Sequence, residues 1–189
     1  MKIALGADHG GFNLKEDIKK FLILEGYKIV DYGTKSHEAC DYPVFAFKVA
    51  KAVSDKKADL GVLICKSGNG MAMVANKLPN VRAAICFDKN VAVLSRQHND
   101  ANILVLGSEH LFDDPGLIVR TWLESSFEGG RHKRRVDQIV KFEKKIFAEK
   151  IKGKLCQRNK KRGVPLDLYP PMKFLGFKRC VGFQIIRLL

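Results

Sequence analysis

The sequence predicts an α/β protein with a single doubly wound parallel sheet in three α/β/α layers, and three observations lead to that fold class. Short apolar runs alternate with helical patterns from the first residues onward, which is the arrangement of βαβ units. The runs LGVLIC and NILVLG contain almost no polar residue, as expected of strands that helices cover on both faces. Turns that contain glycine follow several of the runs, at the sheet edge where ligands of such folds bind.

Five apolar runs are the expected strands. Each is short, and a helical pattern separates most of them from the next, as a parallel sheet requires. In chain order the expected strands are Lys2 to Ala7, Lys28 to Tyr32, Leu60 to Cys65, Val81 to Phe87 and Ile103 to Leu106.

The segments between and after these runs are the expected helices. Asn13 to Glu25 has an amphipathic pattern, and so does the last helix, in which Val136, Ile139 and Val140 recur at near-helical spacing with Lys and Arg on the other face. That last helix is expected to end at about Lys150 and to pack on the body or on a partner chain. The remaining expected helices are Pro43 to Lys56, Met71 to Lys77, Asn90 to Gln97 and Pro115 to Ser125.

The composition fits one globular domain, residues 1–150, with a basic C-terminal extension, residues 151–189. A chain of 189 residues with 46% hydrophobic residues can bury one core. Beyond Lys150 the helical periodicity ends, so a flexible or loosely docked tail is expected. The tail carries +9 of the net charge of +14 and the body +5. A body of that charge fits an anionic small substrate as well as a polyanion.

The N-terminus and the cysteines bear on the compartment. Too few apolar residues precede Gly6 for a signal-peptide core, and no apolar stretch approaches the roughly 18 residues that a membrane span requires. We therefore expect a cytoplasmic protein with no membrane partner. The five cysteines include no CxxC pair, so neither a disulfide framework nor a zinc site is expected.

The most informative segment is the strand that ends at Cys65, together with the turn Lys66 to Gly70. A glycine-rich turn before a helix directs backbone N–H groups at one place, where they and the helix dipole stabilise negative charge. The same field is expected to lower the pKa of the thiol from its free value of about 8.5 and to make Cys65 a base or nucleophile. Cys40 and Cys86 lack this context and are expected to be structural.

Five motifs occur in order along the chain: GADHGGFNLK near the start, Asp41-Tyr42-Pro43, ICKSGNGMAMVANK, the segment Ser95 to Asn102, and Glu128-Gly129-Gly130-Arg131-His132 with Arg135. Together they resemble the ribose-5-phosphate isomerase B family, which also includes galactose-6-phosphate isomerase subunits. The resemblance covers roughly residues 1–145 and implies a Rossmann-like form of the predicted fold. Five motifs at plausible spacing are a specific signal, whereas a lone glycine-rich turn would be weak.

The resemblance implies an aldose–ketose isomerase that interconverts ribose 5-phosphate and ribulose 5-phosphate through an enediolate, in the pentose phosphate pathway. Such an enzyme needs a group that opens the sugar ring and a base beside the carbonyl carbon. The residues implied to be catalytic are Cys65, Ser67, His98 and Asn99. Cys65 is the implied base, with Ser67 assisting it, and His98 the implied ring-opening acid–base, with Tyr42 in support.

The resemblance also implies how the sugar is held. Asp8 is expected to bind a sugar hydroxyl, and the N–H groups of Gly68, Asn69 and Gly70, together with Asn99, to hold the oxyanion. No metal and no organic cofactor is expected, because protein dipoles alone can stabilise an enediolate.

The implied phosphate clamp consists of His9, Arg131 and Arg135. The two arginines are four residues apart, so they would face one way on a helix and grip one dianion with planar forks. In the family, parts of the clamp and the His98–Asn99 pair reach across a subunit interface. A homodimer with shared active sites is therefore implied, with a tetramer as the larger alternative.

One position departs from the family pattern. Glu109 follows Gly107-Ser108 where many relatives carry an arginine. Either the phosphate contact at this position is dispensable or Glu109 points away, and the neighbouring His110 is a candidate to compensate.

Several alternatives stay open beside this reading. A galactose-6-phosphate or allose-6-phosphate isomerase is the nearest, because the distance between the clamp and Cys65 sets the substrate length. A sugar-phosphate-binding protein without turnover, and a basic tail that binds RNA or an anionic membrane, belong to other classes; nucleic acid is not the expected partner. A thiol phosphatase is disfavoured because Met71 stands where its arginine would be needed, and NAD because the GxG at Gly68 is too short for a dinucleotide fingerprint.

Overall fold

A computed structural model describes the chain from Met1 to Lys161, with side chains as far as residue 149. The chain divides into two units, Met1–Lys144 and Lys145–Leu189, and the fold described below is that of the first unit. Residues 162–189, which form most of the predicted basic extension, lie outside the described residues. The predictions made for that extension therefore stay predictions.

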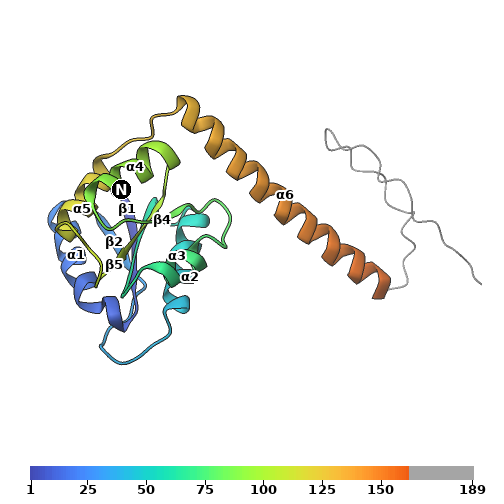
Figure 1. Ribbon diagram of the computed structural model, residues 1–189. Coiled ribbons are helices and arrows are strands. Elements are labelled where there is room, and N and C mark those ends of the chain that lie inside the picture. Colours follow the sequence, from blue (N-terminus) through green and yellow to red (C-terminus); the bar gives the residue numbers. More distant parts are fainter. Residues whose placement is uncertain (162–189) are drawn as a thin grey trace, which may run out of the picture. The chain divides into compact units, whose positions relative to one another are not determined.

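A five-stranded sheet lies at the centre of the first unit (Figure 1). Its strands are β1 (Lys2–Ala7), β2 (Lys28–Asp31), β3 (Leu60–Cys65), β4 (Ala83–Ile85) and β5 (Ile103–Gly107). All neighbouring pairs are parallel, in the order β2-β1-β3-β5-β4. The chain extends to β2 on one side of β1 and to β4 on the other, and then returns to place β5 between β3 and β4, which confirms the predicted doubly wound sheet.

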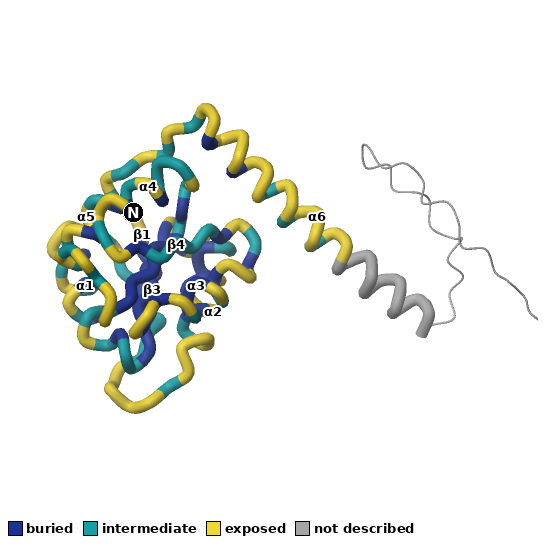
Figure 2. Tube along the Cα trace, viewed as in Figure 1, coloured by how far each residue is buried: buried dark blue, intermediate teal, exposed yellow. Residues whose placement is uncertain are grey.

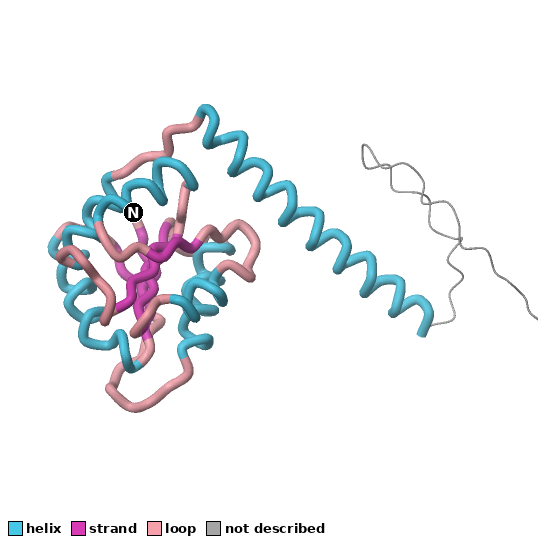
Figure 3. The backbone as a smooth tube through the Cα atoms, viewed as in Figure 1, coloured by secondary structure: helices cyan, strands magenta, loops and turns pink. Residues whose placement is uncertain are grey.

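Helices cover both faces of this sheet and complete the three layers (Figure 3). The helices are η1 (His9–Gly11), α1 (Phe12–Leu24), α2 (Tyr42–Ser54), α3 (Asn69–Ala75), α4 (Lys89–Asn99), α5 (Pro115–Glu124) and α6 (Gly130–Lys161). The helices α2 and α3 pack on one face, and α1, α4 and α5 pack on the other. From α1 to α4, each helix connects one parallel strand to another across one of the two faces. The alternation of strands and helices along the sequence therefore leads to this three-layer fold.

The core consists of two apolar layers, one on each face of the sheet, and the central strands are buried along their length (Figure 2). Alternate residues of β3 enter different layers: Val62 and Ile64 pack towards α1, α4 and α5, and Leu63 packs towards α2 and α3. On the first side Trp122 is fully buried, and its Nε1 donates to Ser95 Oγ at 3.1 Å. Burial on both faces is why these strands are apolar at every position.

Most element bounds agree with the predictions, and two differ in an instructive way. The bounds of β1 and β3 are those predicted. The strand β4 is shorter than the predicted Val81 to Phe87, because the Asn102 side chain accepts from the Arg82 N–H at 2.8 Å in place of a ladder bond. The helix α6 continues to Lys161, beyond the end expected near Lys150. Within the described residues, no helix has the length and apolar character needed to cross a membrane.

The two ends of the sheet carry different groups. Asp8 follows β1 and Cys65 ends β3, so both lie at the carboxyl end of the strands. The helix α4 runs back from the carboxyl end of β4 to the amino end of β5, and Arg82 Nε, beside the start of β4, donates to the carbonyl oxygen of Asn99 at 3.1 Å. The residues that end α4 therefore lie at the amino end, about one strand length, roughly 16 Å, from the carboxyl end.

Candidate active site

The turn after β3 wraps around the sulfur of Cys65. Gly68 has a left-handed backbone with φ of +80°, which a residue without a Cβ adopts at little cost. This conformation directs the Gly68 N–H at Cys65 Sγ, with a distance of 3.1 Å between nitrogen and sulfur. Ser67 and Asn69 are exposed beside it, and the Asn69 N–H donates to Ser67 Oγ at 3.4 Å. The predicted glycine-rich turn thus lies against the thiol.

The electrostatics of Cys65 differ from the expectation. Burial raises the pKa of the thiol, and the nearby carboxylate of Asp8 raises it further. Backbone N–H groups, that of Gly68 first among them, lower the pKa, but by less than the other two effects raise it. The prediction of a lowered pKa is wrong, because removing a thiolate from water costs more than these N–H groups return. In the substrate-free chain the thiol therefore holds its proton at neutral pH.

Two further predicted residues lie on the turn that follows β1. Asp8 is buried, and its Oδ1 accepts from the Gly11 N–H at 3.1 Å. His9 is half-buried, and its Nδ1 accepts from the Cys40 N–H at 3.2 Å. The contact with Cys40 was not predicted, since the two residues belong to segments with no pattern in common. Asp8 and His9 therefore both lie beside Cys65, where β1 and β3 end.

Tyr42 and the turn after β5 complete this end of the sheet. A Cβ built on Gly70 would collide with the Tyr42 ring, so that ring lies directly against the turn. Ser108 joins the neighbouring loops, since its N–H donates to the Cys65 carbonyl oxygen at 2.8 Å and its Oγ to the Gly10 carbonyl oxygen at 2.9 Å. Glu109 is exposed and pairs with Lys66 at 3.5 Å. The acid at this position thus has a lysine partner at the mouth of the turn.

The other predicted residues form a second group. His98 and Asn99 end α4, and Arg131 and Arg135 lie in the first turns of α6. The imidazole of His132 stacks on that of His98, with ring centroids 4.0 Å apart and planes 3° from parallel. Arg131 Nε donates to His132 Nε2 at 3.2 Å. The end of α4 and the start of α6 are therefore in contact.

Glu128 and His132 are members of this second group that were given no role from the sequence. The Glu128 carboxylate lies 3.8 Å from His98 Nε2 and 3.7 Å from His132 Nε2. Burial, His98 and Arg131 lower the pKa of His132, and Glu128 opposes them. Both residues lie inside the last of the five motifs, which was the only signal for them.

The site predicted from the sequence is thus divided between the two ends of the sheet. Asp8, His9, Tyr42, Cys65 and the turn to Gly70 lie at the carboxyl end. His98, Asn99, Arg131 and Arg135 lie at the amino end. Within one chain His9 is therefore separated from the two arginines of the predicted clamp, and Asn99 from the N–H groups with which it was expected to hold an oxyanion.

In the described part of the chain, one group of side chains has the residue types and spacing of metal ligands. It consists of His98, Glu128 and His132, whose donor atoms lie within 4.8 Å of one another. The lone pair of an imidazole lies in the ring plane, and these two planes are nearly parallel. The two lone pairs therefore do not converge on one point. Arg131 also donates to the His132 nitrogen that would bind the ion. The arrangement suits protons better than a divalent cation.

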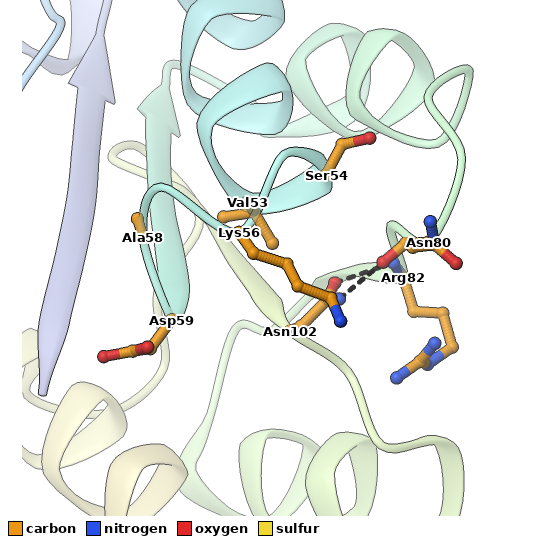
Figure 4. A pocket seen from close by; sticks show the side chains of 8 residues that line it. All are labelled: Val53, Ser54, Lys56, Ala58, Asp59, Asn80, Arg82 and Asn102. Carbon is orange, nitrogen blue, oxygen red and sulfur yellow. Dashed lines mark hydrogen bonds between the residues drawn. The ribbon is translucent and has the colours of Figure 1, made fainter.

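A hollow of about 500 Å³ lies at the amino end of the sheet (Figure 4). Its lining residues are Val53, Ser54, Lys56, Ala58, Asp59, Asn80, Arg82 and Asn102. Three of the polar side chains are already engaged: Arg82 with Asp100 at 2.7 Å, the Asn102 amide with the Asn80 carbonyl oxygen at 2.7 Å, and the Asp59 carboxylate with the Lys2 N–H at 2.7 Å. None of the predicted site residues lines this hollow.

Comparison with known proteins places these residues in a family. Residues 3–139 match the family model described as Ribose/Galactose Isomerase. Ribose-5-phosphate isomerase B of Escherichia coli is 44% identical over 145 residues, which are 76% of this chain and 97% of that protein. Among solved structures, ribose-5-phosphate isomerase B of Clostridium thermocellum is 50% identical, with a TM-score of 0.75 over 77% of this chain and 99% of that one.

A second solved structure is the ribose-5-phosphate isomerase B of Mycoplasma genitalium with bound ribulose 5-phosphate. It is 42% identical to this chain, with a TM-score of 0.73 over 76% of this chain and 96% of that one. The match thus extends along almost the whole of each relative, in sequence and in fold. On this evidence the chain is an isomerase and belongs to the Ribose/Galactose Isomerase family.

Proposed function

We propose that this chain interconverts ribose 5-phosphate and ribulose 5-phosphate, a step of the pentose phosphate pathway. The observation that carries the proposal is the bound ribulose 5-phosphate of the Mycoplasma genitalium relative, which is 42% identical over 96% of its own length. A chain of that similarity that keeps Cys65 in a glycine-rich turn has the groups to act on the same class of sugar phosphate.

The proposed chemistry has two stages, ring opening and isomerisation of the open sugar. His98 opens the sugar ring, with Asn99 beside it. Cys65 then removes the proton from C2 of the open aldose and returns it to C1, while the hydroxyl proton passes from O2 to O1, through an enediolate whose charge backbone N–H groups stabilise. Burial raises the pKa of Cys65, so the thiolate is a minority form before substrate binds. The Gly68 N–H at 3.1 Å from Sγ stabilises that form, and the exposed Ser67 hydroxyl assists the transfer.

We further propose that each active site is assembled from two chains of a homodimer. The support is the separation described above: the base lies at one end of the sheet and the ring-opening imidazole at the other. One copy supplies Cys65, Asp8 and His9, and its partner supplies His98 and Arg131. A second observation is the apolar surface of the first unit, where Val44, Phe47 and Met73 of α2 and α3 have 52%, 52% and 67% of their surface exposed.

The test is isomerase activity of the purified full chain on ribose 5-phosphate, with galactose 6-phosphate and allose 6-phosphate in parallel. Cys65→Ala should reduce kcat by roughly a hundredfold or more, as expected for loss of a general base, and should leave KM nearly unchanged. Cys86→Ala is the matched control, because Cys86 is also buried but belongs to the opposite core layer; it should turn over at the wild-type rate.

Each outcome of this assay has a distinct meaning. Preference for a hexose phosphate would move the proposal to the galactose-6-phosphate or allose-6-phosphate alternative. Undiminished turnover by Cys65→Ala would remove Cys65 from the mechanism. No turnover of any of the three sugars would contradict the proposed function.

A further inference from the structure

Glu128 is held at the junction of α4 and α6 by its backbone and by the glycines that follow it. Its N–H donates to the Gln97 carbonyl oxygen at 3.0 Å. Gly129 and Gly130 both have left-handed backbones, with φ of +73° and +51°, a conformation that other residues rarely adopt. This double turn starts α6 and brings His132 back over His98. The local sequence therefore builds one specific contact between the two helices.

The Glu128 carboxylate faces both stacked imidazoles at once. Its Oε2 lies 3.8 Å from His98 Nε2 and 3.7 Å from His132 Nε2. A negative charge in that place favours the protonated form of His132. Two protonated rings with centroids 4.0 Å apart would repel each other, so the carboxylate can compensate one added proton but not two.

We propose that Glu128 is a positioning residue that holds the His98 and His132 imidazoles as a stacked pair which takes up a single proton. This inference rests on the proposed function only where it assigns His98 to ring opening. There the proton of the anomeric hydroxyl passes to His98 as the C1 carbonyl forms. The C1–O4 bond breaks with its electron pair on the ring oxygen, and that oxygen is then protonated in turn. Glu128 stabilises the imidazolium between these two transfers.

The charges around the pair come from three segments. His98 belongs to α4, Glu128 to the loop before α6, and Arg131, His132 and Arg135 to α6 itself. Burial of His132, its neighbour His98 and the two arginines all lower the pKa of His132, and the Glu128 carboxylate alone raises it. Removal of that carboxylate therefore leaves only groups that disfavour the proton.

The first test needs no substrate. Histidine protonation is followed by NMR in the full chain carrying ¹³C-labelled histidine, with His98→Asn and His132→Asn used to assign the signals. Glu128→Gln should lower the pH midpoint of the His132 signal by about one unit, since an opposite charge within 4–6 Å is lost. Glu124→Gln is the matched control, because Glu124 is an exposed carboxylate four residues earlier; its midpoints should equal those of the wild type. Midpoints unchanged by Glu128→Gln would overturn the inference.

The second test is the pH profile of isomerase activity. Glu128→Gln should lower kcat at neutral pH about tenfold, because the imidazolium loses its partner, and should move the acidic limb of the profile to lower pH. KM should stay nearly constant, and Glu128→Asp should restore part of kcat. An unmoved profile would restrict Glu128 to a structural role and overturn the inference. If the wild-type chain isomerises none of the sugars, the NMR titration still decides whether Glu128 supports the histidine pair. Failure of the proposed function can therefore be told apart from failure of this inference.

Discussion

The sulfur of Cys65 shows how two local effects compete at a single residue. Burial disfavours the thiolate, and the nearby Asp8 adds a like charge, while the Gly68 N–H at 3.1 Å favours it. The turn and its N–H groups could be predicted from the sequence. How deeply Cys65 is buried could not, because that depends on the packing of α2 and α3 against the strand. The place of the thiol against the glycine-rich turn could be predicted from its motif, whereas the sign of its pKa shift could not.

The arginines at the start of α6 allow a prediction at the same scale. Arg135→Ala should raise KM for ribose 5-phosphate about tenfold with little change in kcat, because a phosphate contact contributes similarly to the ground state and the transition state. Arg134→Ala is the matched control, since Arg134 is also exposed and adjacent but is not part of the proposed clamp. Steady-state kinetics of the two variants measure the difference. Equal KM values would place the phosphate clamp elsewhere.

At the scale of elements, an ion cluster fastens α1 to β2. Lys15 is fully buried although it is charged. Its Nζ donates to Asp31 Oδ2 at 2.9 Å and to the Thr34 carbonyl oxygen at 2.8 Å, and Lys19 binds the same carboxylate at 2.8 Å. A lysine in an amphipathic helix is usually expected on the solvent-exposed face. The sequence pattern therefore gave no indication of this cluster. The pairing compensates the cost of burying the charge.

Asp31→Asn should therefore lower the free energy of unfolding at neutral pH by about 3 kcal/mol, because it leaves the buried Lys15 ammonium with the partly exposed Glu16 carboxylate at 2.7 Å in place of two carboxylates. Burial raises the pKa of Asp31, but hydrogen bonds from Lys19, Lys15 and the Gly33 N–H outweigh it, so the net pKa is lowered. The contribution of Asp31 is thus complete above its unfolded pKa of about 3.9 and is lost as the pH falls through its lower folded pKa.

Denaturant unfolding at one protein concentration, repeated from pH 7 downward, measures this difference. The gap between wild type and Asp31→Asn should be constant to about pH 5 and should shrink below about pH 4. Asp17→Asn, which changes an exposed carboxylate on the same helix, should stay within about 0.5 kcal/mol of wild type at every pH. A gap that did not depend on pH would mean that the charge of Asp31 is not what stabilises the cluster.

The elements themselves were predictable to different degrees for physical reasons. Strands buried on both faces are apolar along the buried run, as in all of β3 and in β1 after Lys2, so their ends are visible in the sequence. The edge strand β4 is shorter than its apolar run, because a side chain, Asn102, replaces part of the ladder. The helix α6 outlasts its apolar periodicity, because helix-forming residues such as Lys and Leu continue past residue 150.

At the scale of the whole molecule, the predicted site residues do not meet within one chain. Motif order along a sequence carries no information on which end of a sheet a residue occupies. Topology supplies it: a residue that ends a strand lies at the carboxyl end, and one that ends the following helix lies at the amino end. By this rule Cys65 and His98 are assigned to opposite ends, and the division is a consequence of the βαβ connection itself.

That division makes a quantitative prediction for mixed dimers. Cys65→Ala and His98→Asn should each be nearly inactive alone. In a heterodimer of the two, one site receives both substitutions and the other receives an intact Cys65 from one chain and an intact His98 from its partner. Random pairing after co-expression should therefore restore about a quarter of the wild-type activity per chain, and purification of the heterodimer through two different tags should raise this to about half.

The control is the double variant with both substitutions in one chain, co-expressed with wild type. Under the shared arrangement each of the two sites of its heterodimer receives one substitution, so that heterodimer should be nearly inactive. A complete site within the wild-type chain would instead leave it about half of the wild-type activity, so this pairing also discriminates between the arrangements. If each chain held a complete site, the pairing of Cys65→Ala with His98→Asn would recover no activity at any ratio, and the two ends of the sheet would have to be brought together by a rearrangement within the chain.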